Sequence, residues 1–383
     1  MRVSQILAGL LVATATVSAI AQPMPRPSQP QRPAGPGPGA PQEADMSPTE
    51  RAQMAAVARY QHGLEGFLRA SASPRDQALS VQVMHADDRD GPDPDDPARG
   101  ELLRRAAEAA PNDRLVQWTW AIAPAEVSGC VVTRPCRDRG NALARLEPDN
   151  GAAWVPVVAD AIRFNDAPRV ADALTHMAAA TRYDEVFHDA MGAWMDAFRR
   201  FPAPAELMRS PDGAAADASL AAGTFALAQV ENASAPYEEL LHACQRNGRA
   251  GAATALSASC AQAGRLMIDR ATTLVGRAVG ADLLRSAAAP TPEDRERVRT
   301  NAWLAEQHVK LSGRDANGAQ AHARMGLLIA SESEVAAVQD ELRRANVALT
   351  PPAGWQPARP TRPAGPPAQG QDDADPMPDG PSR

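Results

Sequence analysis

The fold of this chain is decided by the stretch Asn141-Ala142-Leu143-Ala144-Arg145-Leu146-Glu147-Pro148-Asp149-Asn150-Gly151-Ala152-Ala153-Trp154. The residue before a proline is pushed out of the α-helical region, so a helix that begins near residue 138 must end just before Pro148. An Asp or Asn after the proline can accept backbone N–H groups and start a second helix. The stretch therefore predicts two short helices joined by a tight turn, with Trp154 filling the gap between them.

A looser copy of this junction lies upstream. Ala110 is followed by Pro111, Asn112 and Asp113, and Trp118 stands seven residues after the proline. The prolines of the two junctions are 37 residues apart. Recurrence of one junction at such a separation is typical of repeated helical hairpins.

The downstream junction resembles the boundary between two tetratricopeptide repeats, where a Leu-x-Pro-x-Asn turn ends one helix and an aromatic residue follows. The residues that keep this spacing are Leu146, Pro148, Asn150 and Trp154. The resemblance covers about residues 98–165 and implies an α-solenoid of helical hairpins, a class that presents extended binding surfaces. The glycine and tyrosine typical of the first helix of a repeat are missing, so a plain helical bundle is the alternative fold.

The whole body, residues 47–350, is predicted to be all-α. Apolar residues recur at helical spacing, and no sustained alternation indicates a strand. Ser47, Ser73 and Thr291 are each followed by a proline and then by an acidic residue in the first turn, and residues 331–334 read as a capping box. We expect helices near residues 48–70, 74–85, 98–110, 113–123, 138–146, 150–164, 167–181, 183–200, 212–230, 236–246, 252–287 (broken), 291–311 and 318–346.

The two ends of the chain differ in composition from the body. Residues 1–21 read as a secretory signal peptide, with Arg2, an uncharged apolar stretch and an Ala-x-Ala cleavage site at Ala21. Proline supplies 8 of residues 22–46 and 10 of residues 351–383, so both tails are predicted to be disordered. The mature protein is expected in the bacterial periplasm or outside the cell, with no stable membrane insertion after signal cleavage.

Four cysteines fit this compartment. An even number of cysteines in an exported chain favours disulfides over a redox or metal site. Three pairings are possible, and closeness in sequence favours Cys130 with Cys136 and Cys244 with Cys260.

Composition excludes several classes of function. Lys310 is the only lysine among the 39 basic residues, and it does not follow a glycine. A P-loop and a lysine Schiff-base site are therefore excluded. The net charge of −7 argues against nucleic-acid binding, which requires a basic face. No catalytic motif is present, and no cofactor is expected.

One pattern of metal ligands stands out. Glu185 with His188, and Glu239 with His242, form two Glu-x-x-His motifs of the kind that helical bundles use for di-metal sites. On ideal helices, however, all four side chains fall off the apolar faces, which for the first motif is the face of Phe187.

These observations predict an exported helical-repeat protein that acts as a binding or scaffold module of the bacterial envelope, with a protein or peptide as its partner. The alternative is a metal-binding bundle or an enzyme that uses the two Glu-x-x-His motifs.

Overall fold

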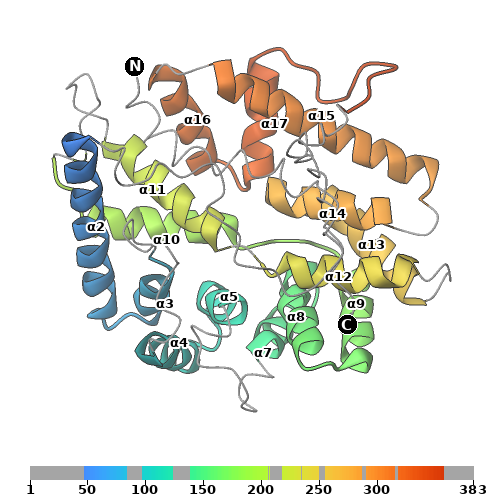
Figure 1. The fold of residues 1–383 in the computed structure, drawn as a ribbon, viewed down its shortest axis with the longest axis horizontal. Helices are drawn as coiled ribbons and strands as arrows, with labels where there is room; N and C mark the ends of the chain where they lie inside the picture. Colours follow the sequence, from blue (N-terminus) through green and yellow to red (C-terminus); the bar gives the residue numbers. More distant parts are fainter. Residues whose placement is uncertain are drawn as a thin grey trace, which may run out of the picture.

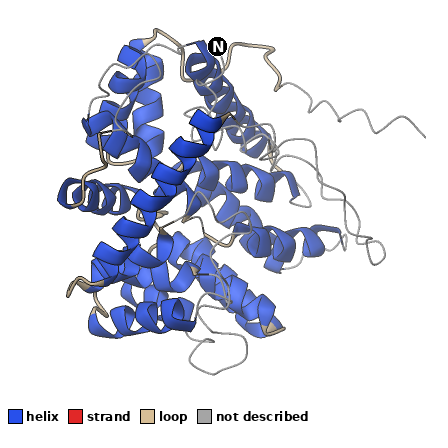
Figure 2. Ribbon diagram, turned by 60° about the vertical axis from the view of Figure 1, so that its left-hand side comes forward, coloured by secondary structure: helices blue, strands red, loops and turns tan. Residues whose placement is uncertain are grey.

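The computed structural model describes residues 47–83, 97–123, 139–205, 207, 218–233, 235–249, 255–286, 290–314 and 318–357. Over these residues the chain is all-helical, as predicted, and the only extended pairing is an isolated bridge between Asn150 and Arg182 (Figure 2). Among the described helices, none combines the length and the apolar character needed to cross a bilayer. The segment 1–21, which is predicted to be a signal peptide, and the Pro-rich segment 22–46 lie outside the described residues.

From α2 to α9 the helices pack on their neighbours in chain order (Figure 1). Helix α3 contacts α2, α4 and α5, and the series continues from α5 through α7 and α8 to α9. The elements are α2 (Pro48–Arg69), α3 (Pro74–Gln82), α4 (Pro97–Ala109), α5 (Arg114–Ile122), α7 (Arg139–Leu146), the 3-10 helix η3 (Gly151–Trp154), α8 (Val155–Arg163), α9 (Ala167–Ala179) and α10 (Phe187–Arg200).

The second half folds back onto the first. Helix α12 packs on α8, α13 packs on α9, and α16 packs on α10 and α11. Helices α15, α16 and α17 lie together along one edge in Figure 1. The elements are α11 (Ala218–Asn232), α12 (Tyr237–Arg249), α13 (Ala255–Arg270), α14 (Leu274–Ser286), α15 (Pro292–Arg314), α16 (Gly318–Ala330) and α17 (Glu334–Arg344).

Local capping chemistry sets several helix starts. The Ser73 side chain accepts the N–H of Asp76 at the start of α3. The carboxylate of Asp113 accepts the first N–H groups of α5. Thr291 and Asp294 accept each other's backbone N–H groups before α15, in a reciprocal capping box.

Two expected helices differ clearly from the structure, and the break expected within residues 252–287 is confirmed. The helix expected over 183–200 begins only at Phe187, because the residues before it are extended. The broken helix expected over 252–287 divides into α13 and α14 at residues 271–273. The single helix expected over 318–346 divides before α17, since Ser333 accepts the N–H of Ala336 and caps a new helix.

The core is rich in alanine, and a few large side chains anchor it. Trp194 is fully buried on α10, and Trp118 is buried on α5. Part of the C-terminal segment that was predicted to be disordered, residues 351–357, is described and lies against α15. There Trp355 packs edge-on against Trp303 at 5.3 Å between ring centroids, and Arg299 donates to the Trp355 carbonyl.

Small residues let α13 and α14 approach closely. A Cβ on Gly264 would lie 2.9 Å from the carbonyl oxygen of Gly280, and a Cβ on Gly280 would lie 2.8 Å from that of Gly264. Real Cβ atoms do not approach backbone oxygens so closely, so this crossing requires glycine on both helices.

A disulfide between Cys244 and Cys260 joins α12 to α13. This is one of the two expected pairs, and both cysteines are buried. The other expected pair, Cys130 and Cys136, lies outside the described residues.

Replacing both Cys244 and Cys260 with alanine is expected to lower the free energy of unfolding by about 2–3 kcal/mol. The bond links residues 16 positions apart and restricts the unfolded chain. Urea denaturation of the oxidised protein measures the loss. A peptide map without reduction that joined Cys244 to Cys130 would contradict this pairing.

Candidate functional site

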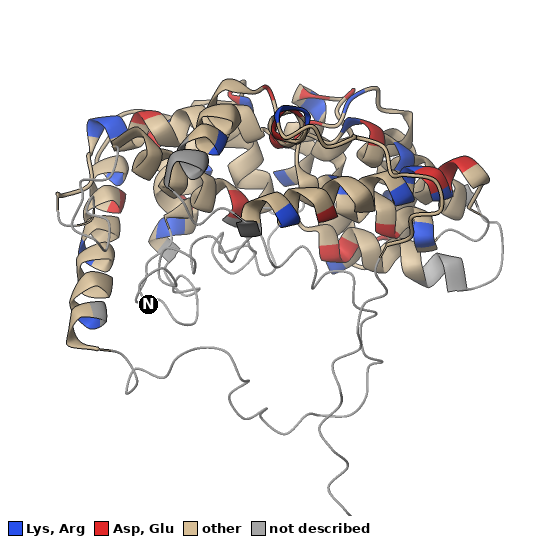
Figure 3. Ribbon diagram, turned by 90° about the horizontal axis from the view of Figure 1, so that it is seen from above, with Lys and Arg blue, Asp and Glu red and all other residues tan. Residues whose placement is uncertain are grey.

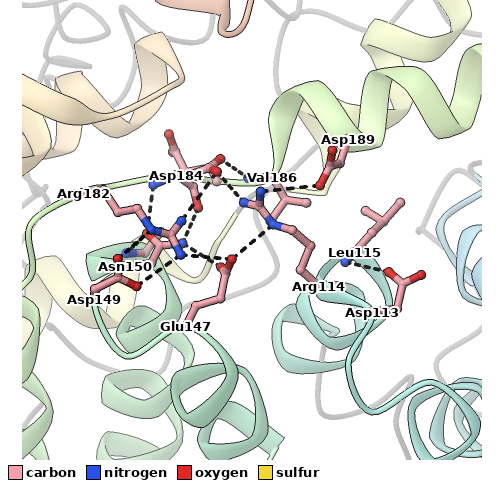
Figure 4. Close-up of polar contacts among 12 residues, drawn as sticks. Asp113, Arg114, Leu115, Glu147, Asp149, Asn150, Arg182, Asp184, Val186 and Asp189 are labelled. Atoms are coloured by element: carbon pink, nitrogen blue, oxygen red, sulfur yellow. Dashed lines mark hydrogen bonds and ion pairs between the residues drawn. The ribbon is translucent and has the colours of Figure 1, made fainter.

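A densely hydrogen-bonded polar region surrounds the extended segment between α9 and α10. The N–H groups of Thr181 and Arg182 reach the carbonyl of Asp149, and the N–H of Gly151 reaches the carbonyl of Arg182 at 2.8 Å. These bonds keep the segment extended and prevent the helix that periodicity predicted. Because side chains alternate along extended backbone, Arg182 and Asp184 face the turn after Pro148, as Figure 4 shows.

The Asn150 side chain fastens this segment to the turn. Its Oδ1 accepts the N–H groups of Ala152 and Asp184, at 3.2 and 2.9 Å. Its Nδ2 donates to Glu147 Oε2 and to the carbonyl of Asp184, at 2.9 and 2.8 Å. Asn150 is fully buried, and these four hydrogen bonds match the two donor and two acceptor sites of its amide.

Two arginines form ion pairs with acidic residues around this link (Figure 4). Arg114 on α5 contacts Asp184 and also Glu147 at 3.3 Å. Arg182 contacts Glu147 at 3.1 Å and Asp149 at 3.1 Å. The hydrogen bond from Arg182 is the main cause that lowers the pKa of Asp149. The turn, α5 and the extended segment are thus joined by charges as well as by Asn150.

Asp184 also shapes the start of α10. Its Oδ1 accepts the N–H of Val186 at 2.9 Å. Val186 has a φ of +61°, in the left-handed region that a β-branched residue rarely adopts. The surrounding bonds hold this strained residue, and α10 turns away from the extended segment there.

Glu185 lies on the opposite side of the segment, inside the protein. Its Oε1 accepts from the Tyr237 hydroxyl and from Thr273 Oγ1, and its Oε2 accepts from the Thr273 N–H and from Thr272 Oγ1. Tyr183 donates to the Tyr237 oxygen at 3.3 Å. Burial raises the pKa of Glu185, and the four hydrogen bonds oppose that rise.

This geometry makes Glu185 a structural acceptor. A carboxylate offers about four acceptor positions, and four donors occupy those of Glu185. The donors come from the start of α12 and from the link between α13 and α14. The carboxyl therefore joins three distant parts of the chain.

The structure does not bring the four candidate metal ligands together. His188 Nδ1 lies 3.0 Å from the Ser331 carbonyl, Glu239 pairs with Arg163 at 3.7 Å, and His242 is exposed on α12. Within the described ranges, no group of three or more His, Cys, Asp or Glu side chains could hold a metal ion. The expectation that Glu185 lies away from the apolar interior is wrong, because residues 183–185 do not belong to the helix, which begins only at Phe187.

A second feature, which sequence reasoning missed, is a groove of about 320 Å³ between α15, α16 and α17. Within it, Glu341 accepts from Arg324 at 2.6 Å and lies 3.1 Å from His308. Burial raises the pKa of Glu341, but these two partners outweigh it and the net shift is downward. The lining residues are Leu311, Ala323, Arg324, Leu327, Glu341, Arg344 and Ala345.

Comparison with protein-family models finds no match to this chain, and comparisons with curated proteins and with solved structures find none either.

Replacing Asn150 with alanine is expected to lower the free energy of unfolding by about 2–4 kcal/mol, because several buried partners lose their hydrogen bonds at once. Asp149→Asn is the matched control. It weakens only a more exposed ion pair with Arg182 and should cost about 0–1 kcal/mol. Urea denaturation measures both variants, and equal losses would contradict the role assigned to Asn150.

Gly276→Ala and Gly192→Ala are expected to act in opposite directions. A Cβ on Gly276 would lie 2.5 Å from Glu185 Oε1, whereas one on Gly192 of α10 meets nothing within 4 Å. Gly276→Ala should lower the free energy of unfolding by about 1–3 kcal/mol. Gly192→Ala should raise it by about 0.5–1 kcal/mol through helix propensity. Thermal unfolding followed by circular dichroism distinguishes the two results.

Proposed function

We propose that this protein is an exported helical-repeat binding or scaffold protein of the bacterial envelope, and that its partner is a protein or peptide. The junction at residues 141–154 and the succession of neighbouring helices from α3 to α9 support a repeat-like origin. The secretory character of residues 1–21 supports export. The view in Figure 3 supports a protein partner over a nucleic acid, because basic and acidic residues are interspersed along the helices.

The groove between α15, α16 and α17 is the observation that carries the proposal. Leu311, Leu327 and Ala323 supply apolar surface within it. A groove between helices with apolar walls and a few polar groups is a common site for peptide side chains.

The charges at the groove indicate which peptides fit. Arg344 is exposed at its edge and makes no ion pair with another residue of the described part of the chain. Arg324 lies inside the groove, where Glu341 already neutralises it. We therefore propose a partner segment that places an apolar side chain in the groove and an acidic group beside Arg344.

Selection from a random peptide library against the immobilised full chain tests this proposal. We expect enrichment of peptides that pair an apolar residue with Asp or Glu. Fluorescence anisotropy of the selected peptides should show at least about tenfold weaker binding to Arg344→Glu, since an attractive charge becomes a repulsive one.

Arg343→Glu is the matched control, because the preceding residue Arg343 is also exposed but pairs with Asp340. Its affinity for the selected peptides should stay within about threefold of the wild-type value. Selection without enrichment, or peptides that bind both variants equally well, would reject the groove as the binding site.

A further inference from the structure

The segment that follows α17 turns back and crosses α15. Asn346 has a φ of +55°, and the Val347 N–H donates to the Leu342 carbonyl, so α17 ends in a left-handed cap. From there to Pro357 the chain forms no helix. Ordering such a segment costs conformational entropy, which specific contacts must offset. The contacts that hold it therefore show what the facing surface of α15 binds.

A tight turn shapes the far part of this segment. The Trp355 N–H donates to the Pro352 carbonyl at 3.1 Å, and Gly354 between them has a φ of +78°. A hydrogen bond across four residues with a glycine at positive φ in the third position is typical of a type II β-turn. Residues 352–354 are exposed, whereas Trp355 is half-buried. The turn thus presents one large side chain to the protein.

Two residues on one face of α15 receive this turn. Arg299 and Trp303 are four positions apart on the helix, so their side chains are neighbours. Arg299 Nη1 donates to the carbonyls of Pro352 and Trp355, at 3.2 and 3.3 Å. The rings of Trp303 and Trp355 meet edge to face, with 5.3 Å between their centroids. The site therefore binds backbone carbonyls, which every peptide carries, and one aromatic ring.

Both residues of the site are also held by contacts outside the turn. Glu296 accepts from Arg299 Nε and Nη2 at 2.7 and 2.8 Å, which leaves Nη1 for the carbonyls of the turn. Trp303 Nε1 donates to the carbonyl of Ala348 at 2.7 Å. A site whose side chains are already ordered loses less entropy when it binds.

The near part of the segment is anchored separately from the turn. Val347 and Leu349 pack against a cluster of buried apolar side chains from α15 and α17. These two residues, with Ala348 between them, belong to the body of the protein. The turn is joined to that anchor by only a few residues, so it lies beside its site at all times.

We propose that Arg299 and Trp303 form a docking site for a Pro-x-Gly-aromatic turn, and that residues 352–355 are a tethered ligand that keeps this site closed to other chains. The partner is a peptide segment that forms the same turn and places its own aromatic ring on Trp303. Because the contacts involve carbonyls and one ring, they do not require that the turn be continuous with α17. This inference does not depend on the partner proposed for the groove.

The sequence contains its own comparison for this specificity. Pro-Ala-Gly occurs at residues 33–35, 352–354 and 363–365, and the residues that follow are Pro36, Trp355 and Pro366. Proline has no backbone N–H to close the turn and no aromatic ring. Of the three copies, only the one at 352–354 therefore meets both requirements of the site.

Calorimetric titration of the full chain with a synthetic peptide of residues 350–357 tests the proposal. Trp355→Ala removes the ring of the tethered turn and should open the site. We expect this variant to bind the peptide with a dissociation constant below about 1 mM, because a short tether supplies an effective concentration of about that size. The wild-type chain should bind at least about tenfold more weakly, since its own turn competes. Adding Trp303→Ala to the open variant should weaken binding at least about tenfold.

Two controls match these measurements. Gln356→Ala changes an exposed side chain next to Trp355 and should leave the site as closed as in the wild type. A peptide of residues 360–367 carries Pro366 where the turn needs an aromatic residue. It should bind the open variant at least about tenfold more weakly than the peptide of residues 350–357.

Gly354→Val is the second way to open the site. A Cβ at this position meets nothing within 4 Å, so the change acts through the φ of +78°, which valine disfavours. It replaces Trp355→Ala if that variant does not fold. Failure of both variants to fold, no binding of the 350–357 peptide to the open chain, equal binding to the wild type, or binding that survives the loss of Trp303 would overturn the proposal.

Discussion

The buried amide of Asn150 is the interaction on which the rest of this structure depends. The turn after Pro148 and the extended segment before α10 both bring backbone polar groups into the interior, where each group needs a partner. Asn150 satisfies the N–H and the carbonyl of Asp184 together, at 2.9 and 2.8 Å. Once this segment is fixed as extended backbone, alternation places Asp184 toward α5 and Glu185 toward the opposite side, where α12, α14 and α17 meet.

A composition rich in alanine explains why polar contacts matter so much in this protein. Aromatic residues make up only 4% of the chain, so side-chain shape offers few distinctive features that could align one helix with another. Hydrogen bonds to Asn150, Glu185 and Glu334 are directional, and each is satisfied in one arrangement only. These bonds fix the relative positions of segments that apolar packing between small side chains alone would define poorly.

Helix α17 makes a different set of contacts at each of its two ends. Glu334 at its start caps α14, while Glu341 and Arg344 near its end belong to the groove. The contact at the start of α17 therefore helps to hold one wall of the groove in place.

The sequence by itself determined the all-helical class, the junction at Pro148, and many helix starts, including those capped by Ser73, Asp113 and Thr291. These features depend on groups within a few residues of one another, so a local pattern is sufficient to predict them. The sequence also pointed to Glu185, but as a metal ligand, whereas the structure makes it a buried hydrogen-bond acceptor. Only the tertiary structure decided that Glu185 and Glu334 cap a helix that begins far away in the chain. The partners of a buried polar group are set by which segments the fold brings together, and no local spacing records that.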